Sequence, residues 1–245
     1  MSAARCRSRV GRVSIVLGRR TEDSTPAAGT CSSAEVLEYT HIEGLSSADV
    51  VRLRETYEPL TESVRALIDA TIRTQADAGT VAAARAEIDA VTARLRSRQL
   101  DGAFGVQFTS DGDQMPWGNP VVGIRNPVAP PLVIHRDEND RVSTDFDLGA
   151  AYEGPPGHVH GGVAALVLDH VLGEAASDRR TPRLTGTITM RYLRTTRLGR
   201  LHAEAQIARV EGIKAFVVGH LADEDGVTVE AEGVFIKPRW AREEA

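Results

Sequence analysis

The sequence predicts an α+β protein, in which an antiparallel sheet wraps around one central helix and a helical segment precedes the sheet. In the first half, apolar residues recur at steps of three and four; from about residue 132 they recur at every second position, between short turns. One apolar stretch, residues 161–177, returns to helical spacing. The composition, 42% hydrophobic and 26% charged over 245 residues, excludes collagen-like, wholly disordered and membrane-spanning classes.

Residues 1–45 are expected to form a disordered tail. Residues 1–30 contain six arginines and two acidic residues, and the apolar run at 13–17 is shorter than the core of a secretory signal. A plain solvated tail, a start codon placed too far upstream and an organellar transit peptide stay open. We expect a cytoplasmic protein.

The charge and the cysteines exclude several classes of function. The formal net charge is -5, and the basic tail leaves the rest of the chain more acidic still, which argues against a nucleic-acid partner. Nor do we expect a membrane partner, since no apolar run is long enough to span a bilayer. Both cysteines, Cys6 and Cys31, lie near the N-terminus, so the body has neither a disulfide framework nor a thiolate metal site.

Residues 46–100 are predicted to form a helical segment of two helices, with a break between them near Gly79. Ser46 or Ser47 is the expected N-cap of the first helix. Pro59 is expected to interrupt or bend the first helix. The segment is either a lid or oligomerisation arm, or helices that only pack against the next domain. Residues 101–130, rich in Gly, Pro, Asp and Asn, are interpreted as a linker leading into a domain at 131–240.

That domain opens with a hairpin in which residues 132–134 pair with the alternating strand 142–148. The helix 161–177 follows, and then four strands joined by short turns form a meander; they span residues 184–193, 201–209, 214–222 and 227–237. The order of two strands, one helix and four strands resembles the hotdog fold. The chain has no dinucleotide fingerprint, phosphate-binding P-loop or G-x-S-x-G nucleophile elbow.

The start of the helix carries the candidate chemistry. Gly161 and Gly162 stand where backbone N–H groups are unpaired and the helix dipole is positive, so these groups can polarise a carbonyl and stabilise an oxyanion. Alternatively, these two glycines only form a tight turn at the start of the helix. Asp169 lies in an otherwise apolar helix, where a carboxylate is costly unless it is paired or used. It is either a general base or nucleophile, or a surface Asp paired with Arg191.

The segment Gly-His-Val-His-Gly-Gly at 157–162, with Asp169 nine residues after His160, resembles the signature of PaaI-like hotdog acyl-CoA thioesterases, within the 4-hydroxybenzoyl-CoA thioesterase superfamily. The strand at 185–192 and the later segments 210–214, 231–233 and 235–237 are similar to the animal thioesterase superfamily proteins. The resemblance covers about residues 130–240. It implies that Gly161 and Gly162 polarise the thioester and that Asp169 is the catalytic acid. Many relatives carry prolines after the position of Tyr192, whereas this chain does not.

The resemblance also places a water-holding hydroxyl on Thr185, which is otherwise an ordinary β-branched strand residue. His160 is expected to support the loop through hydrogen bonds. His158 and His160 lack a third ligand, and the resemblance implies no metal, so we expect neither metal nor redox cofactor. Arg191, Arg194 and Arg197 are either a site for the phosphates of coenzyme A or a solvated strand end.

The spacing of the two key residues predicts an assembly. Gly161 and Asp169 are eight residues apart, which at ~1.5 Å per residue separates them by about 12 Å along one helix. One thioester cannot contact both, so the site should combine Gly161 of one subunit with Asp169 of its partner across a two-fold axis. The family resemblance implies the same homodimer, or a dimer of dimers.

The sequence therefore predicts an enzyme that hydrolyses an acyl-CoA thioester to the free acid and coenzyme A. Two alternatives remain. A hotdog hydratase or dehydratase would use His158 or His160 together with Asp169, and a non-catalytic acyl-CoA binding protein would keep the pocket without turnover.

Overall fold

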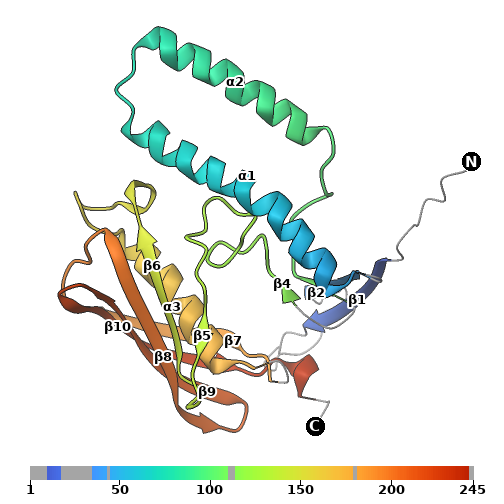
Figure 1. The fold of residues 1–245 in the computed structure, drawn as a ribbon. Helices are drawn as coiled ribbons and strands as arrows, with labels where there is room; N and C mark the ends of the chain where they lie inside the picture. Colours follow the sequence, from blue (N-terminus) through green and yellow to red (C-terminus); the bar gives the residue numbers. More distant parts are fainter. Residues whose placement is uncertain (1–9, 18–34, 43–44, 110–113, 179–180, 243–245) are drawn as a thin grey trace, which may run out of the picture.

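The computed structural model describes residues 10–17, 35–42, 45–109, 114–178 and 181–242. A helical hairpin and a sheet wrapped around one helix form the two main parts of the molecule (Figure 1). The hairpin consists of α1 (Ser47–Arg73) and α2 (Ala78–Arg96), and short irregular segments lie between it and the sheet (Figure 1).

Both helices of the hairpin begin at side-chain caps. Ser46 caps α1 in a reciprocal capping box with Asp49, and Asp77 caps α2 by accepting from the N–H groups of Gly79 and Thr80. The break between the helices therefore lies just before Asp77, and Gly79 belongs to the first turn of α2. Pro59 lies inside α1 and does not end it, so the expected interruption of the helix does not occur. The chain leaves α1 only at Thr74, so the helix tolerates one missing N–H donor in its interior.

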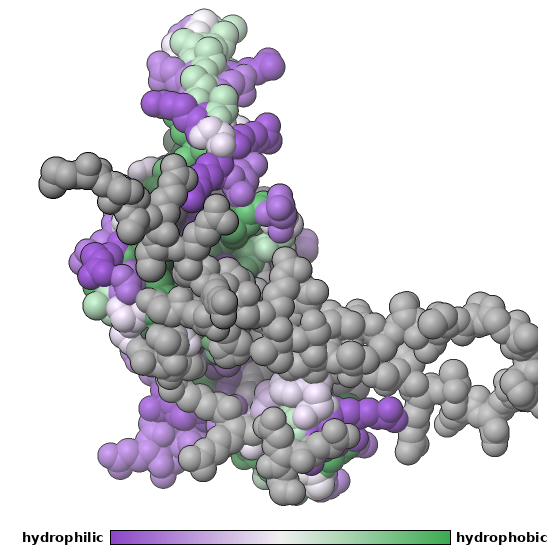
Figure 2. Space-filling view, turned by 90° about the vertical axis from the view of Figure 1, so that its right-hand side faces the viewer, coloured by the Kyte–Doolittle hydropathy of each residue, from purple (hydrophilic) through white to green (hydrophobic). Residues whose placement is uncertain are grey.

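The helical hairpin projects from the body, and hydrophilic residues cover much of its surface (Figure 2). No residue of α2 is buried, and in α1 only Thr61 is. Among the described residues, no helix is long and apolar enough to cross a membrane.

The N-terminal segment differs in part from the expected tail. β1 (Val10–Leu17) and β2 (Glu35–Ile42) pair antiparallel along their whole length, so these stretches have regular backbone partners. β2 also pairs with β3 (Gln107–Phe108), which pairs with β4 (Gln114–Met115). The rest of the expected tail, apart from Leu45, lies outside the described residues.

Residues 114–130, in the second part of the expected linker, pack against the rest of the protein at several points. Met115, Trp117 and Ile124 are buried in a small second core, against which Leu53 and Tyr57 of α1 pack. Farther along, Val121 belongs to the main core. The Gly and Pro content that predicted a linker instead makes consecutive turns around these apolar anchors.

The main sheet is antiparallel with the strand order β5-β6-β8-β9-β10-β7. Its strands are β5 (His135–Arg136), β6 (Val142–Leu148), β7 (Leu184–Tyr192), β8 (Gly199–Glu211), β9 (Lys214–Asp223) and β10 (Gly226–Ile236). β8, β9 and β10 form the expected meander. β7 does not join it at β8, because the chain crosses after Tyr192 and leaves β7 at the far edge beside β10.

The central helix α3 (Gly161–Ala176) lies in the concave side of this sheet (Figure 1). Its apolar residues fill the main core together with inward side chains from β6, β8, β9 and β10. The largest contributors are fully buried: Leu148, Leu168, Leu172, Leu201, Leu221 and Phe235. An almost entirely apolar helix is stable only when it is covered on most sides, and the curved sheet supplies that cover. The hotdog architecture expected from the sequence is confirmed.

Candidate active site

The start of α3 is fixed by the loop before it. The His160 N–H donates to the carbonyl of Tyr152 at 2.9 Å, and the Val159 N–H donates to the carbonyl of Thr196 at 2.9 Å. The loop is thus held between the segment before it and the segment that crosses after β7. The N-terminus of α3 has a fixed position as a result.

Two glycines permit this loop. Gly157 has φ +73°, in the left-handed region that L-residues with side chains rarely adopt. At Gly154, a Cβ atom would lie 2.7 Å from the Cα of His160, so any side chain would force the loop away from the helix start. Gly154 and Gly157 therefore have a geometric basis that does not depend on catalysis.

The four N–H groups at the start of α3 have different environments. The Val163 and Ala164 N–H groups donate to the carbonyl of His160, at 2.8 and 3.2 Å. The Gly162 N–H donates to Nδ1 of His160 at 3.0 Å, so this imidazole is the side-chain cap of the helix. Only the Gly161 N–H has no acceptor in the part of the chain that the structure describes.

The sequence suggested the same role for the N–H groups of Gly161 and Gly162, but the structure gives them different ones. His160 makes the hydrogen bond expected of a supporting residue, and the cap requires an unprotonated Nδ1. Gly162 contributes its N–H to that cap. One donor, the Gly161 N–H, stays open for a ligand carbonyl at the positive end of the helix dipole.

Asp169 is half-buried on α3, and its Oδ1 accepts a hydrogen bond of 2.9 Å from the hydroxyl of Thr185 on β7. Arg191 does not pair with it; that guanidinium lies 3.6 Å from Glu230 instead. The Asp169 carboxylate and the Thr185 hydroxyl therefore form a hydrogen-bonded polar pair between α3 and β7.

A β-bulge directs Thr185 toward Asp169. The pairing of β7 with β10 runs from Val234–Thr187 directly to Phe235–Thr185, so Gly186 is an extra residue on β7. Ile188 and Met190 face the core, so strict alternation would turn Thr185 to the opposite face. The extra residue reverses the alternation and brings the Thr185 hydroxyl to the helix side. A Cβ at position 186 would lie 2.8 Å from the side chain of Ile236.

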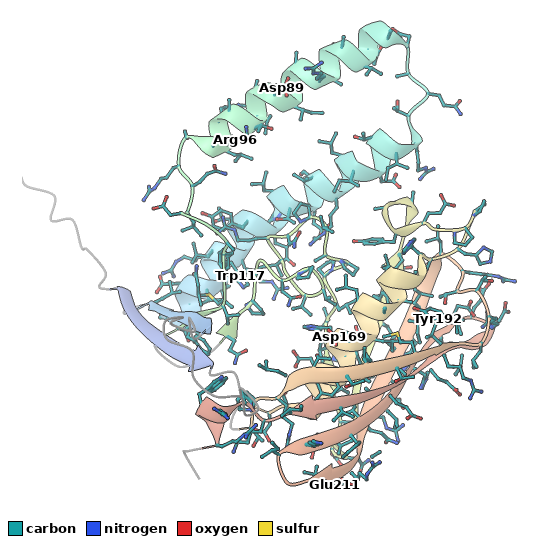
Figure 3. The ribbon with its side chains drawn as sticks, turned by 180° about the vertical axis from the view of Figure 1, so that it is seen from behind. Asp89, Arg96, Trp117, Asp169, Tyr192 and Glu211 are labelled. Carbon is teal, nitrogen blue, oxygen red and sulfur yellow. The ribbon has the colours of Figure 1, made fainter. Side chains whose placement is uncertain are left out.

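Tyr192 is a site residue that the sequence reasoning missed. Its hydroxyl donates to the carbonyl of Gly161 at 2.8 Å, from the opposite end of β7. The ring edge lies 3.5 Å from where a Gly161 Cβ would be. Asp169 and Tyr192 therefore mark two separate points along α3 and β7 (Figure 3). An aromatic residue at a strand end carries no local signal for this contact.

A chain of hydrogen bonds joins α1 to the site. The Arg65 guanidinium, whose side chain is 15% exposed, donates to the carbonyls of Ala129 and Asn126 at 3.0 and 2.9 Å. Between these two acceptors, the Val128 carbonyl accepts a 2.8 Å hydrogen bond from the Tyr152 hydroxyl. Tyr152 also holds the backbone of His160, so the helical hairpin helps to fix the loop before α3.

The three arginines suggested for coenzyme A phosphates each have an acidic neighbour. Arg194 binds both carboxylate oxygens of Asp223 at 2.9 and 2.5 Å, and this pairing lowers the pKa of Asp223 to about 2. Arg197 lies 3.0 Å from Glu224, and Arg191 is paired as described above. The Arg194 contact is a largely buried structural ion pair, because the Asp223 side chain is only 2% exposed.

Two further histidines, His158 in the motif and His170 on α3, make other contacts. Nδ1 of His158 is 2.8 Å from the carbonyl of Pro156, within its own loop. Burial lowers the pKa of His170, whose Nε2 lies 3.6 Å from Glu174. Within the described ranges, no group of three or more His, Cys, Asp or Glu side chains is arranged to hold a metal ion.

Comparisons with known proteins identify the family. A sequence model of the thioesterase superfamily matches residues 156–230, which include the glycine motif, Asp169 and Thr185. A solved structure described as a thioesterase superfamily protein is 32% identical, with a TM-score of 0.64; the match covers 74% of this chain and 94% of the other. The chain belongs to the thioesterase superfamily. The family expected from the sequence is confirmed.

Other solved structures match a smaller share of this chain. The Escherichia coli PaaI protein from the phenylacetic acid degradation operon is 14% identical, with a TM-score of 0.41, over 44% of this chain and 80% of its own. A putative thioesterase from Ralstonia eutropha JMP134, described as phenylacetic acid degradation-related, is 23% identical with the same TM-score, over 44% of this chain and 85% of its own.

Proposed function

We propose that this thioesterase superfamily member hydrolyses an acyl-CoA thioester to the free acid and coenzyme A, at two equivalent sites in a homodimer. The Gly161 N–H of one subunit polarises the thioester carbonyl. Asp169 of the other subunit acts as general base or nucleophile, and Thr185 holds the attacking water or the carboxylate. The reaction uses no metal and no redox group. A cytoplasmic location stays a prediction.

The observation that carries the proposal is the separation of the two half-sites within one chain. Gly161 contacts Tyr192 at the end of β7, whereas Asp169 contacts Thr185 near its beginning. α3 therefore runs antiparallel beside β7, with the donor at one end and the carboxylate about 12 Å away along the helix. Neither half-site can serve the carbonyl held by the other half-site of the same chain.

The outer edge of β7 favours a two-fold partner. Among the described strands β7 pairs only with β10, although it is nine residues long and rich in threonine. Such an edge is a template for pairing with another chain. Antiparallel pairing of two β7 strands about a two-fold axis near the middle of the strand would bring the Thr185 end of one strand beside the Tyr192 end of the other. That pairing brings each carboxylate to the partner's open N–H.

The uncovered face of α3 supports the same arrangement. Gly162, Leu166, Asp169 and Gly173 form a stripe at helical spacing that the sheet leaves wholly or partly open to solvent. Leu166 is 38% exposed, and Leu184 and Tyr192, at the two ends of β7, are exposed as well. A second copy would cover this apolar surface, and the same patch on both subunits would meet across the two-fold axis.

The arrangement favours hydrolysis over the hydratase alternative. A hydratase would need a histidine available for proton transfer, but His160 is engaged as the helix cap and His158 faces its own loop. The hydrogen-bonded pair of Asp169 and Thr185 suits the activation of water. The non-catalytic acyl-CoA binder would keep this geometry, so turnover alone separates it from the enzyme.

The test is release of free thiol from short, medium, long and aromatic acyl-CoAs. Wild type should release coenzyme A from at least one of them, and Asp169→Asn and Asp169→Ala should abolish release. Asp89→Asn is the matched control, because Asp89 lies on α2, away from the site, and should leave turnover unchanged (Figure 3). A folded wild type that releases no thiol from any substrate would refute the proposal and favour the binder.

A further inference from the structure

An open groove of about 770 Å³ lies between α1, the end of α2 and the loop that follows α2. Its wall combines apolar and cationic side chains. The apolar ones are three exposed leucines, Leu60, Leu95 and Leu100. The cationic ones are three arginines, Arg94, Arg98 and Arg125. No Asp or Glu is among the described residues that line this groove.

The three arginines lack acidic partners. Within the part of the chain that the structure describes, none of them lies in an ion pair. Arginines on α1 behave differently: Arg54 pairs with Glu58, and Arg65 pairs with Glu62. The chain as a whole is acidic, with a net charge of -5, so three uncompensated cations around one hollow form a local positive field.

Arg125 is held in place without losing its charge. Its guanidinium carbon lies 3.7 Å from the centre of the Tyr57 ring and 5.2 Å from that of Phe104. Phe104 in turn stacks on the buried ring of Trp117. Stacking uses the face of a guanidinium and leaves the N–H donors at its edge free to bind an anion in a fork.

Two simpler explanations account for less. A cation in the last turn of a helix complements the helix dipole, which explains Arg94 but not Arg125, since that residue comes from a distant segment. A second copy of the chain covering the groove through two-fold symmetry would bring the same arginines against these ones. Like charges would then meet, which opposes that contact.

We infer that this groove binds an amphipathic anion: a carboxylate or phosphate head on the three guanidinium groups, and an apolar chain along the three leucines. The head would make charge-assisted hydrogen bonds, and the chain would remove leucine surface from water. The inference does not depend on the proposed function, because the groove shares no residue with the candidate active site.

The test is isothermal titration of the whole protein with decanoate and decyl phosphate, below the concentrations at which they form micelles. Decyltrimethylammonium tests the charge, and acetate tests the head group alone. The variant is Arg94→Gln combined with Arg98→Gln. The matched control is Arg96→Gln, because Arg96 lies on α2 like Arg94 but does not line the groove (Figure 3).

We expect wild type and Arg96→Gln to bind both anions, and the double variant to bind them at least about tenfold more weakly at one site per chain, which corresponds to about 1.4 kcal/mol. The cation and acetate should bind poorly. Thiol release without added amphiphile should be equal in all three proteins, so a failed thioesterase assay would not affect this result. Equal anion binding in double variant and control, equal binding of the cation, or no binding to wild type would overturn the inference. So would dissociation of a larger assembly in the double variant, since a second copy would then occupy the groove.

Discussion

Replacement of Gly161 by proline removes the one backbone N–H group at the start of α3 that has no acceptor among the described residues, and so tests its role directly. Proline has no N–H, and the first helical position tolerates it because that N–H has no partner within the helix. His160 before it has φ -62° and ψ 131°, an extended conformation that residues before proline favour. A Cβ at Gly161 would lie 3.5 Å from the Tyr192 ring, an ordinary contact. The fold should therefore survive.

The matched control is Gly161→Ala, which adds the same Cβ but keeps the N–H. Since the Gly162 N–H is already used by His160, proline removes the one N–H at this helix start that has no acceptor among the described residues. Loss of one oxyanion donor costs about 10²–10³ in kcat, or about 3–4 kcal/mol. The Ala variant should lose much less than the Pro variant.

Thiol release at varied substrate concentration, with unfolding in urea as a check on stability, measures this effect. An interaction made only in the transition state lowers kcat and kcat/KM together, so KM should change little in the Pro variant. Equal rates for the Pro and Ala variants, both folded, would refute the assignment of the Gly161 N–H as the oxyanion donor.

Three further predictions concern groups around the site. Thr185→Val removes the hydroxyl that donates to Asp169 and should lower kcat by up to about tenfold, whereas Thr185→Ser should restore it; equal rates in the two variants would exclude a role for the hydroxyl. Tyr152→Phe should cost about 1 kcal/mol in urea unfolding and lower kcat, because the loop before α3 loses its bond to Val128; an unchanged kcat would show that this bond does not affect the site. Asp223→Asn should lower the free energy of unfolding at pH 7 by about 2 kcal/mol, since pairing with Arg194 depresses the carboxyl pKa. Its stabilising effect is present above the unfolded pKa and is lost as pH falls from about 4 to about 2, so urea unfolding of the two proteins should converge in that range; a constant difference would contradict the pairing.

Local pattern predicted the elements that carry the site. The apolar stretch beginning at Gly161 becomes α3 at nearly the expected length, and the alternating runs become strands, because each depends on a periodicity visible in the sequence. The position of Asp169 on an apolar helix likewise identified it as a candidate site residue from the sequence alone, without knowledge of its partner Thr185. For the expected linker, Gly and Pro indicated turns but could not show that an apolar residue between them, such as Trp117, is buried.

Non-local contacts could not be predicted. The place of β7 at the far edge depends on its pairing with β10, which is distant in sequence, and the bulge at Gly186 that turns Thr185 toward Asp169 depends on the same pairing. A lone glycine in a strand was the one available signal for that bulge. The contact of Tyr192 with Gly161 and the pairing of Arg194 with Asp223 join residues about 30 apart, beyond the reach of any periodicity.

The most direct test of the shared site is a mixed dimer of Gly161→Pro and Asp169→Asn chains. Each parent should be inactive as a homodimer. A mixed dimer would contain one site with both intact groups, so random association of equal amounts should restore about a quarter of the wild-type thiol release. Recovery near that level is the result we predict. No recovery from mixed dimers that are shown to form would contradict a site built from two chains.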